Sequence, residues 1–149
     1  MKPLFVLLGT FAVSLLVTRL GRSTFDVTLA GRIALAVMLV FTATGHFIFT
    51  RGMTAMLPAF VPFRAFMVYL TGVLEILAAV GLFVPGLWVL TGYLLVLFFI
   101  LILPANIYAA ANHLNYETGA TNGKGLAYLW FRVPFQLLLM GWAWYFAIR

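Results

Sequence analysis

Long apolar stretches, separated by single charges and short polar links, dominate the sequence. The first runs without a charge from Pro3 to Thr18, between Lys2 and Arg19. As a helix it measures about 24 Å, less than a bilayer core, so it crosses a membrane only with snorkelling ends or local thinning. A signal peptide also has a basic residue before an apolar run, but no A-x-A cleavage site follows here, which favours a retained helix.

Four further apolar stretches are long enough for membrane spans of about 20 residues. Pro85 and Gly86 form a turn after the second of them, and Pro104 should kink the next by freeing a backbone carbonyl. Residues 113–125 read as an aqueous loop, and the last stretch has tryptophan and tyrosine near its ends, as in an aromatic belt. These expected spans cover about residues 32–50, 66–84, 87–111 and 126–148.

The stretch from Arg51 to Arg64 is different because Pro58 and Pro62 interrupt it. Two prolines four residues apart disfavour a regular spanning helix, yet the segment is too apolar for a solvated loop. We therefore expect it to lie in the membrane interface or to fold back as a cap over polar residues in the membrane. Phe60 and Phe63 should then be shielded from water.

Composition supports an integral membrane protein. The 149 residues are 65% hydrophobic and only 8% charged, far from the roughly half-apolar, quarter-charged make-up of soluble domains. The length allows one transmembrane domain over residues 1–149, all-α, with about five membrane-spanning helices and no separate catalytic domain.

Charge and cysteine content narrow the choice of partners and cofactors. The net charge of +6 comes from basic residues scattered singly, which argues against nucleic acid and for lipid headgroups of the bilayer as the partner. Five basic residues fall on the side of the N-terminus and four on the other, too even to fix the orientation. The absence of cysteine excludes a dithiol redox relay and thiolate metal sites.

Polar residues inside the expected spans are the candidates for function, because a charge at helix centre costs about 2.5–3.5 kcal/mol on insertion scales. Alternating span directions put them in one half of the membrane, at depths of roughly 6–15 Å on the side of the N-terminus. Helical spacing gives them a common face, since Thr42 and His46, Thr71 and Glu75, and Arg132 and Gln136 are each four apart. The candidate ligand-pocket residues are His46, Thr71, Glu75, Asn106, Arg132 and Gln136.

Two interpretations of this polar layer stay open. Buried polar residues often serve only to hold membrane helices together, and Glu75 with Arg132 would make a neutralising ion pair; we expect that pair to be the central contact. The other interpretation is a small ligand pocket. A metal site is disfavoured because the two histidines are distant and no His-x-x-x-His or paired carboxylates occur, and no catalytic nucleophile motif is present.

Several short motifs follow one another in order over about residues 31–149. They are Gly45-His46-Phe47, Pro58 and Pro62, Thr71-Gly72 with Glu75, Gly81-Leu82 with Pro85, Pro104-Ala105-Asn106, and Arg132-x-Pro134-x-Gln136. In this order the chain resembles the DoxX family, in its DoxX-like branch of small bacterial membrane proteins. The resemblance implies a four-helix membrane bundle similar in outline to vitamin K epoxide reductase, here with an additional N-terminal helix at about residues 3–20.

The resemblance also implies a setting for function. Family members are linked to quinone-coupled oxidoreductase complexes and, in animals, to chaperoning of receptor subunits. The first expectation is an accessory subunit of membrane redox chemistry that binds a quinone or another lipid in a bacterial inner membrane, with no cofactor supplied by the chain itself. The alternative is a non-enzymatic assembly factor or scaffold that packs against a membrane protein partner or a second copy; whether the protein is an enzyme stays open. A transporter ranks third, since no internal repeat is present.

An odd number of spans predicts that the two termini lie on opposite sides of the membrane. Cysteines introduced beside Lys2 and Arg149 should therefore react with a membrane-impermeant reagent from opposite faces of sealed vesicles. Labelling of both from the same face would require an even number of spans and would remove the first helix from the bundle.

Overall fold

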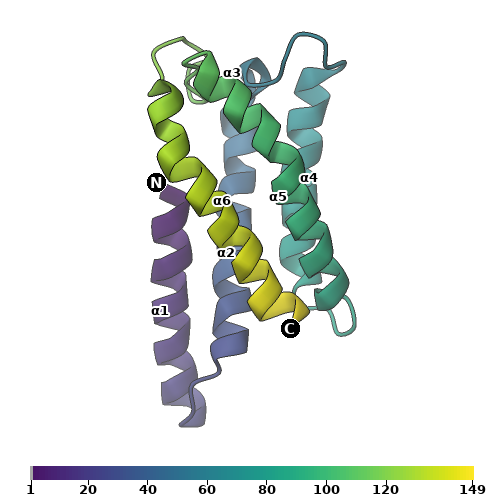
Figure 1. Cartoon of the computed structure of the whole chain (residues 1–149). Coiled ribbons are helices and arrows are strands. Elements are labelled where there is room, and N and C mark those ends of the chain that lie inside the picture. Colours follow the sequence, from purple (N-terminus) through teal and green to yellow (C-terminus); the bar gives the residue numbers. More distant parts are fainter. Residues whose placement is uncertain (1) are drawn as a thin grey trace.

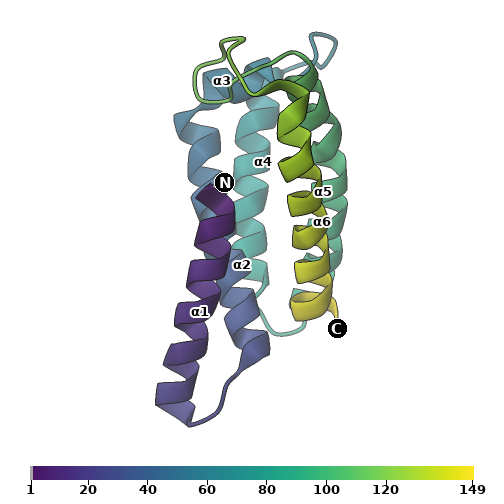
Figure 2. The same cartoon turned by 60° about the vertical axis from the view of Figure 1, so that its left-hand side comes forward.

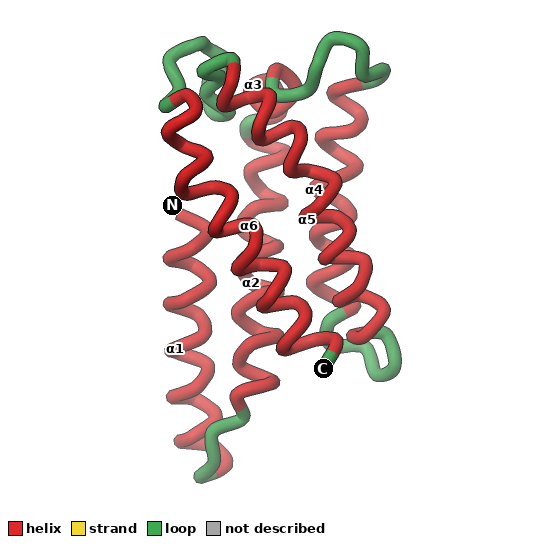
Figure 3. The backbone as a smooth tube through the Cα atoms, viewed as in Figure 1, coloured by secondary structure: helices red, strands yellow, loops and turns green. Residues whose placement is uncertain are grey.

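The computed structural model describes residues 2–149 and is helical, with no strand in that range. Figures 1 and 2 show long helices running alternately down and up the molecule, and Figure 3 shows the loops gathered at its two ends. The elements are α1 (Lys2–Arg22), α2 (Val27–Ile48), α3 (Thr50–Ala55), α4 (Arg64–Gly81), α5 (Trp88–Ala111), a 3₁₀ turn (Gly125–Tyr128), α6 (Leu129–Ala143) and a π-helix (Trp144–Ile148). The expected helical membrane bundle is confirmed in class.

Four of the helices, α1, α2, α4 and α5, are long and apolar enough to cross a membrane. The fifth expected span, 126–148, is present as three consecutive pieces: the 3₁₀ turn, α6 and the π-helix. Its regular α-helical part is the 15 residues of α6, too short by itself for a hydrocarbon core of about 30 Å. The first span is longer than its uncharged stretch, because α1 continues through Arg19 and Arg22.

The core lies where α2, α5 and α6 meet. It is built from small residues and leucines of α2 together with large side chains of the other helices, among them Leu35, Leu39, Leu95, Phe99 and Leu139. Figure 1 shows α5 and α6 inclined relative to α2 and α4, and Figure 2 shows α5 and α6 side by side. Most other large apolar side chains face outward, as expected of a bundle surrounded by lipid.

The N-terminal part of α2 is fixed by two polar contacts. Asp26 caps its start, accepting a hydrogen bond of 2.9 Å from the amide of Leu29. One and a half turns further on, Arg32 donates to the carbonyl of Phe146 at 2.8 Å and stacks on Trp88, 4.5 Å from the ring centre. The π-helix at the C-terminal end of the chain is thereby held against α2.

The N-terminal helix α1 packs mainly against α2. In Figures 1 and 2 it begins at about mid-height of the bundle and extends beyond the turn that joins α4 to α5. Lys2 connects its start to the loop after α5, with Nζ 3.4 Å from a carboxylate oxygen of Glu117. The start of α1 therefore points toward the end of the bundle that carries this loop, and the C-terminal π-helix lies at the opposite end.

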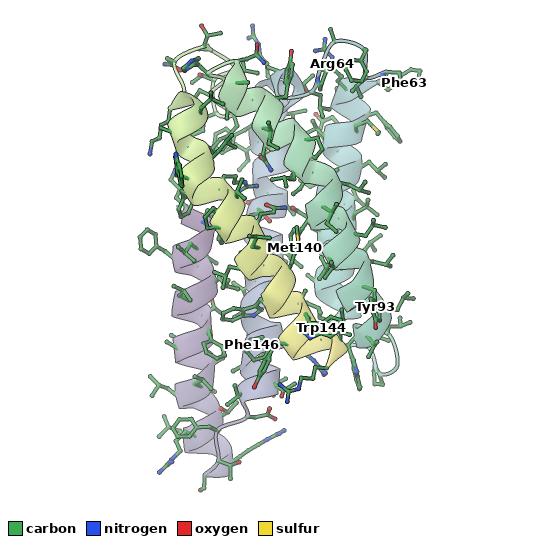
Figure 4. All side chains as sticks on the ribbon, viewed as in Figure 1. Phe63, Arg64, Tyr93, Met140, Trp144 and Phe146 are labelled. Atoms are coloured by element: carbon green, nitrogen blue, oxygen red, sulfur yellow. The ribbon has the colours of Figure 1, made fainter. Side chains whose placement is uncertain are left out.

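The segment between α2 and α4 only partly matches its prediction as a cap. It forms the short helix α3 and a loop at one end of the bundle, as expected for an interfacial element. Phe60 and Phe63, however, are 86% and 81% exposed, so little of either ring packs against the chain. Phe63 has a left-handed backbone, with φ of 51°, and in Figure 4 its ring projects outward from the molecule. The chain itself does not shield these rings, because the turn before α4 directs them away from the bundle; their shielding from water in a membrane stays a prediction.

Gly52 provides a stability test of this end. Its α-carbon lies so close to the carbonyl of Tyr116 that an added Cβ would collide with backbone. Gly52→Ala should therefore lower the free energy of unfolding by about 1–3 kcal/mol. Gly9→Ala is the matched control, since no atom lies within 4 Å of the position of its Cβ. Thermal melts in one detergent would show a lower melting temperature for Gly52→Ala than for Gly9→Ala. Equal melting temperatures would contradict the close approach of Gly52 to the carbonyl of Tyr116.

Candidate functional site

Four polar side chains meet between α2 and α4, and we name them the Glu75 cluster: Thr42, His46, Thr71 and Glu75. Thr42 Oγ1 donates to Glu75 Oε2 at 3.1 Å. The same carboxylate oxygen lies 3.5 Å from His46 Nε2, and His46 Nδ1 lies 3.0 Å from Thr71 Oγ1. Each helix contributes two residues four apart, the spacing that places them one above the other on one face.

The close packing of α2 on α4 brings these groups together. The buried residues of α4 are Val68, Gly72, Glu75 and Ala79, a single stripe with helical spacing. A Cβ on Gly72 would lie only 2.9 Å from the Cβ of His46, so the absence of a side chain there lets the two backbones approach. Glu75 is 5% exposed, and it is the buried member of the chain's three acidic residues.

The hydrogen-bond pattern of the cluster places one proton position between His46 and Glu75. Thr71 has a single hydroxyl hydrogen and can direct it to the carbonyl of Val68, 2.8 Å away, in which case it accepts from His46 Nδ1–H. His46 Nε2 then faces the carboxyl group of Glu75. A proton between these two groups gives either a neutral acid with a neutral imidazole or a carboxylate with an imidazolium. Both arrangements have zero net charge, which suits an apolar surrounding.

The other three candidates lie on α5 and α6 and find partners elsewhere. Asn106 is buried and donates to the carbonyl of Ile102 in its own helix, at 3.2 Å. Gln136 is 1% exposed and donates to the carbonyl of Phe99 on α5, at 2.6 Å. In the part of the chain that the structure describes, Arg132 Nε and Gln136 Oε1 are buried without a hydrogen-bond partner.

The expected contact between Glu75 and Arg132 is wrong. The carboxylate has closer partners on α2, because α4 packs mainly against that helix. The guanidinium of Arg132 instead lies 5.8 Å from the ring centre of Phe135. Its positive charge also affects Tyr116, in the loop after α5. Burial raises the pKa of Tyr116 in that loop and Glu117 raises it further, whereas the charge of Arg132 lowers it.

The structure thus brings three of the six candidates, His46, Thr71 and Glu75, together in one polar cluster, in which the 3.5 Å approach of His46 to Glu75 links two hydrogen bonds. It adds Thr42, which helical spacing places on the face of His46 but which was not among the candidates. One hollow of about 390 Å³ lies at Arg51 and Arg64 and another of about 390 Å³ at Trp130 and Pro134, and none of the six candidates lines either of them. No group of three metal-binding side chains occurs among residues 2–149. A ligand pocket beside Glu75 stays a prediction.

These features define a multi-pass helical membrane protein with a partly buried carboxyl–imidazole pair between two of its helices. The chain belongs to a family described as a domain of unknown function, DUF8561, whose profile matches residues 35–147. The matched region includes the whole Glu75 cluster and leaves α1 outside. No curated protein and no solved structure matches the chain.

A double-mutant cycle tests the cluster. His46→Leu and Glu75→Gln should be coupled by about 0.5–3 kcal/mol in the free energy of unfolding, because each removes the partner of the other. Glu75→Gln combined with Arg132→Met should instead be additive, since the two residues do not touch. Unfolding would be followed by circular dichroism in one mixed-micelle system. Additivity of the His46 and Glu75 changes, or coupling between Glu75 and Arg132, would contradict the arrangement.

Proposed function

We propose that the protein is an accessory subunit of membrane redox chemistry that binds a lipid-soluble quinone beside the Glu75 cluster. The observation that carries the proposal is the carboxyl–imidazole pair of Glu75 and His46, held inside an apolar bundle. A quinone oxygen accepts hydrogen bonds. Both ring nitrogens of His46 are engaged within the cluster, so a bound quinone would replace Thr71 as the acceptor of the Nδ1–H hydrogen bond while Glu75 keeps its place at Nε2. Electrons would come from a separate redox protein, since the chain contains no redox-active side-chain pair.

The surroundings of His46 support access from the lipid. Its side chain is 17% exposed, whereas that of Glu75 is 6% exposed, so the imidazole is the member that a ligand in the bilayer could reach. Phe47 and Tyr69 stack with ring centres 5.8 Å apart and are both exposed on the outside of the α2–α4 contact. Such a pair offers an aromatic surface for a flat ring. The resemblance to the DoxX family supports a quinone and a bacterial inner membrane as the setting.

The alternative is a non-enzymatic assembly factor or scaffold, and a different observation favours it. Gly9 on α1 and Gly141 on α6 have nothing within 4 Å of the position that a Cβ would take. Exposed glycines on membrane helices allow another helix to approach closely. A membrane partner or a second copy would then occupy these faces, and the Glu75 cluster would serve only to join α2 to α4.

Binding of a short-chain quinone analogue such as decylubiquinone tests the first proposal. We expect saturable quenching of tryptophan fluorescence in the purified protein, weakened at least tenfold by Glu75→Gln because a hydrogen-bonding partner of the ligand site is altered. Glu117→Gln is the matched control, since Glu117 lies in the exposed loop, and it should bind as the unmodified protein does.

Mass spectrometry of the protein extracted in mild detergent separates the two proposals. A co-purifying quinone that is lost in Glu75→Gln and kept in Glu117→Gln supports the quinone subunit. A stoichiometric protein partner that is lost in Gly9→Leu or Gly141→Leu, with no quinone present, supports the scaffold and overturns the redox proposal.

A further inference from the structure

A positively charged hollow lies at the end of the bundle that carries α3. It has a volume of about 390 Å³, within the range of small-molecule sites. It is bounded by α3, the first residue of α4 and the loop after α5. The residues that matter in its lining are Arg51, Thr54, Arg64, Thr118, Gly119 and Ala120.

No acidic side chain compensates the two arginines. The chain has three acidic residues, and within residues 2–149 each is paired elsewhere: Asp26 with Arg22, Glu75 with His46, and Glu117 with Lys2. Arg64 uses one donor for the carbonyl of Leu57, at 3.4 Å, which leaves most of its guanidinium free, and Arg51 is exposed. Two uncompensated guanidinium groups on one hollow favour a phosphate, which accepts several of their hydrogen bonds at once.

The hollow is formed by packed backbone and does not depend on side chains alone. Gly119 has φ of +74°, and the position of its Cβ lies 3.6 Å from the α-carbon of Gly52 on α3. The loop is thus seated directly on α3. This contact fixes two of the walls, α3 with Arg51 and the loop after α5, before any ligand arrives, which lowers the entropic cost of binding.

The position of the hollow indicates a lipid as the source of the phosphate. Phe60 and Phe63, on the segment between the two arginines, are among the most exposed aromatic residues of the chain. Figure 4 shows Phe63 and Arg64 together at this end, with the phenylalanine ring directed outward. Below them the face of α4 away from α2 is apolar and exposed, with Phe66, Met67 and Leu70. Aromatic rings beside a cationic site above an apolar helix are typical of a membrane interface.

We propose that this hollow binds the phosphate of an anionic phospholipid, with Arg51 and Arg64 as its ligands and the acyl chains lying along α4. This site is separate from the Glu75 cluster and does not depend on the proposed quinone. It would fix the height of this end of the bundle at the headgroup layer.

The experiment measures lipid retention by native mass spectrometry and melting temperature in nanodiscs of phosphatidylcholine with and without phosphatidylglycerol. The intact protein should keep phosphatidylglycerol selectively and melt at a higher temperature with it. Arg51→Gln/Arg64→Gln should bind it about 30-fold more weakly, since each near-surface arginine adds attraction to an anionic lipid. Arg19→Gln/Arg149→Gln is the control, with the same loss of charge at the other end of the molecule, and should retain the lipid.

Three results would overturn the proposal. Equal loss of phosphatidylglycerol in the two double variants would mean general attraction between a cationic protein and an anionic membrane. Retention by Arg51→Gln/Arg64→Gln would mean that the hollow is not the site. Stabilisation by inorganic phosphate in pure phosphatidylcholine nanodiscs, dependent on the same two arginines and not improved by phosphatidylglycerol, would assign the hollow to free phosphate. Because lipid retention is read by mass, a variant that melts early still gives an answer.

Discussion

The burial of one carboxyl group constrains the arrangement of half of the bundle. Glu75 sits on the α2-facing stripe of α4, in an apolar surrounding where an isolated charge would be costly. Its partners His46 and Thr42 both come from α2, so α4 must pack against that helix in one register. Gly72 makes the register accessible by allowing the backbones to approach, and most of the remaining surface of α4 is left to the lipid. The contact therefore sets both the position of α4 and its lipid-facing side.

The hydrophobic pattern was sufficient to predict the helical class and the approximate positions of all the long helices. It could not predict that α1 continues past charged residues. Arg19 and Arg22 are exposed, so they extend the helix without disturbing its packing. Nor could it show that the last apolar stretch is divided into a 3₁₀ turn, α6 and a π-helix. That division depends on contacts with distant residues, such as the hydrogen bond from Arg32 to the carbonyl of Phe146.

For the candidate site, helical spacing correctly predicted which residues share a face of one helix. It could not predict which helices pack against each other. The pairs Thr42 and His46, and Thr71 and Glu75, share faces as their spacing predicts, and these faces meet. Depth in the membrane alone suggested Arg132 as the partner of Glu75, but depth says nothing about which helices are neighbours. The weak packing between α4 and α5 compared with that between α4 and α2 was not visible in the sequence. The hollow at Arg51 and Arg64 is likewise a product of the chain folding back on α3.

The location of the partners of Glu75 has a consequence for biosynthesis. A helix that carries an acidic residue inserts into the bilayer more easily when the hydrogen-bonding partners of that residue are already in the membrane, because contact with them offsets the cost of removing the acid from water. His46 and Thr42 precede Glu75 in the chain, so they leave the ribosome first and are in place on α2 when α4 is inserted. Reversing the order of these two helices by circular permutation would present the acid to the membrane before its partners exist. The order of the helices along the chain thus lowers the free-energy cost of inserting Glu75 into the membrane during assembly.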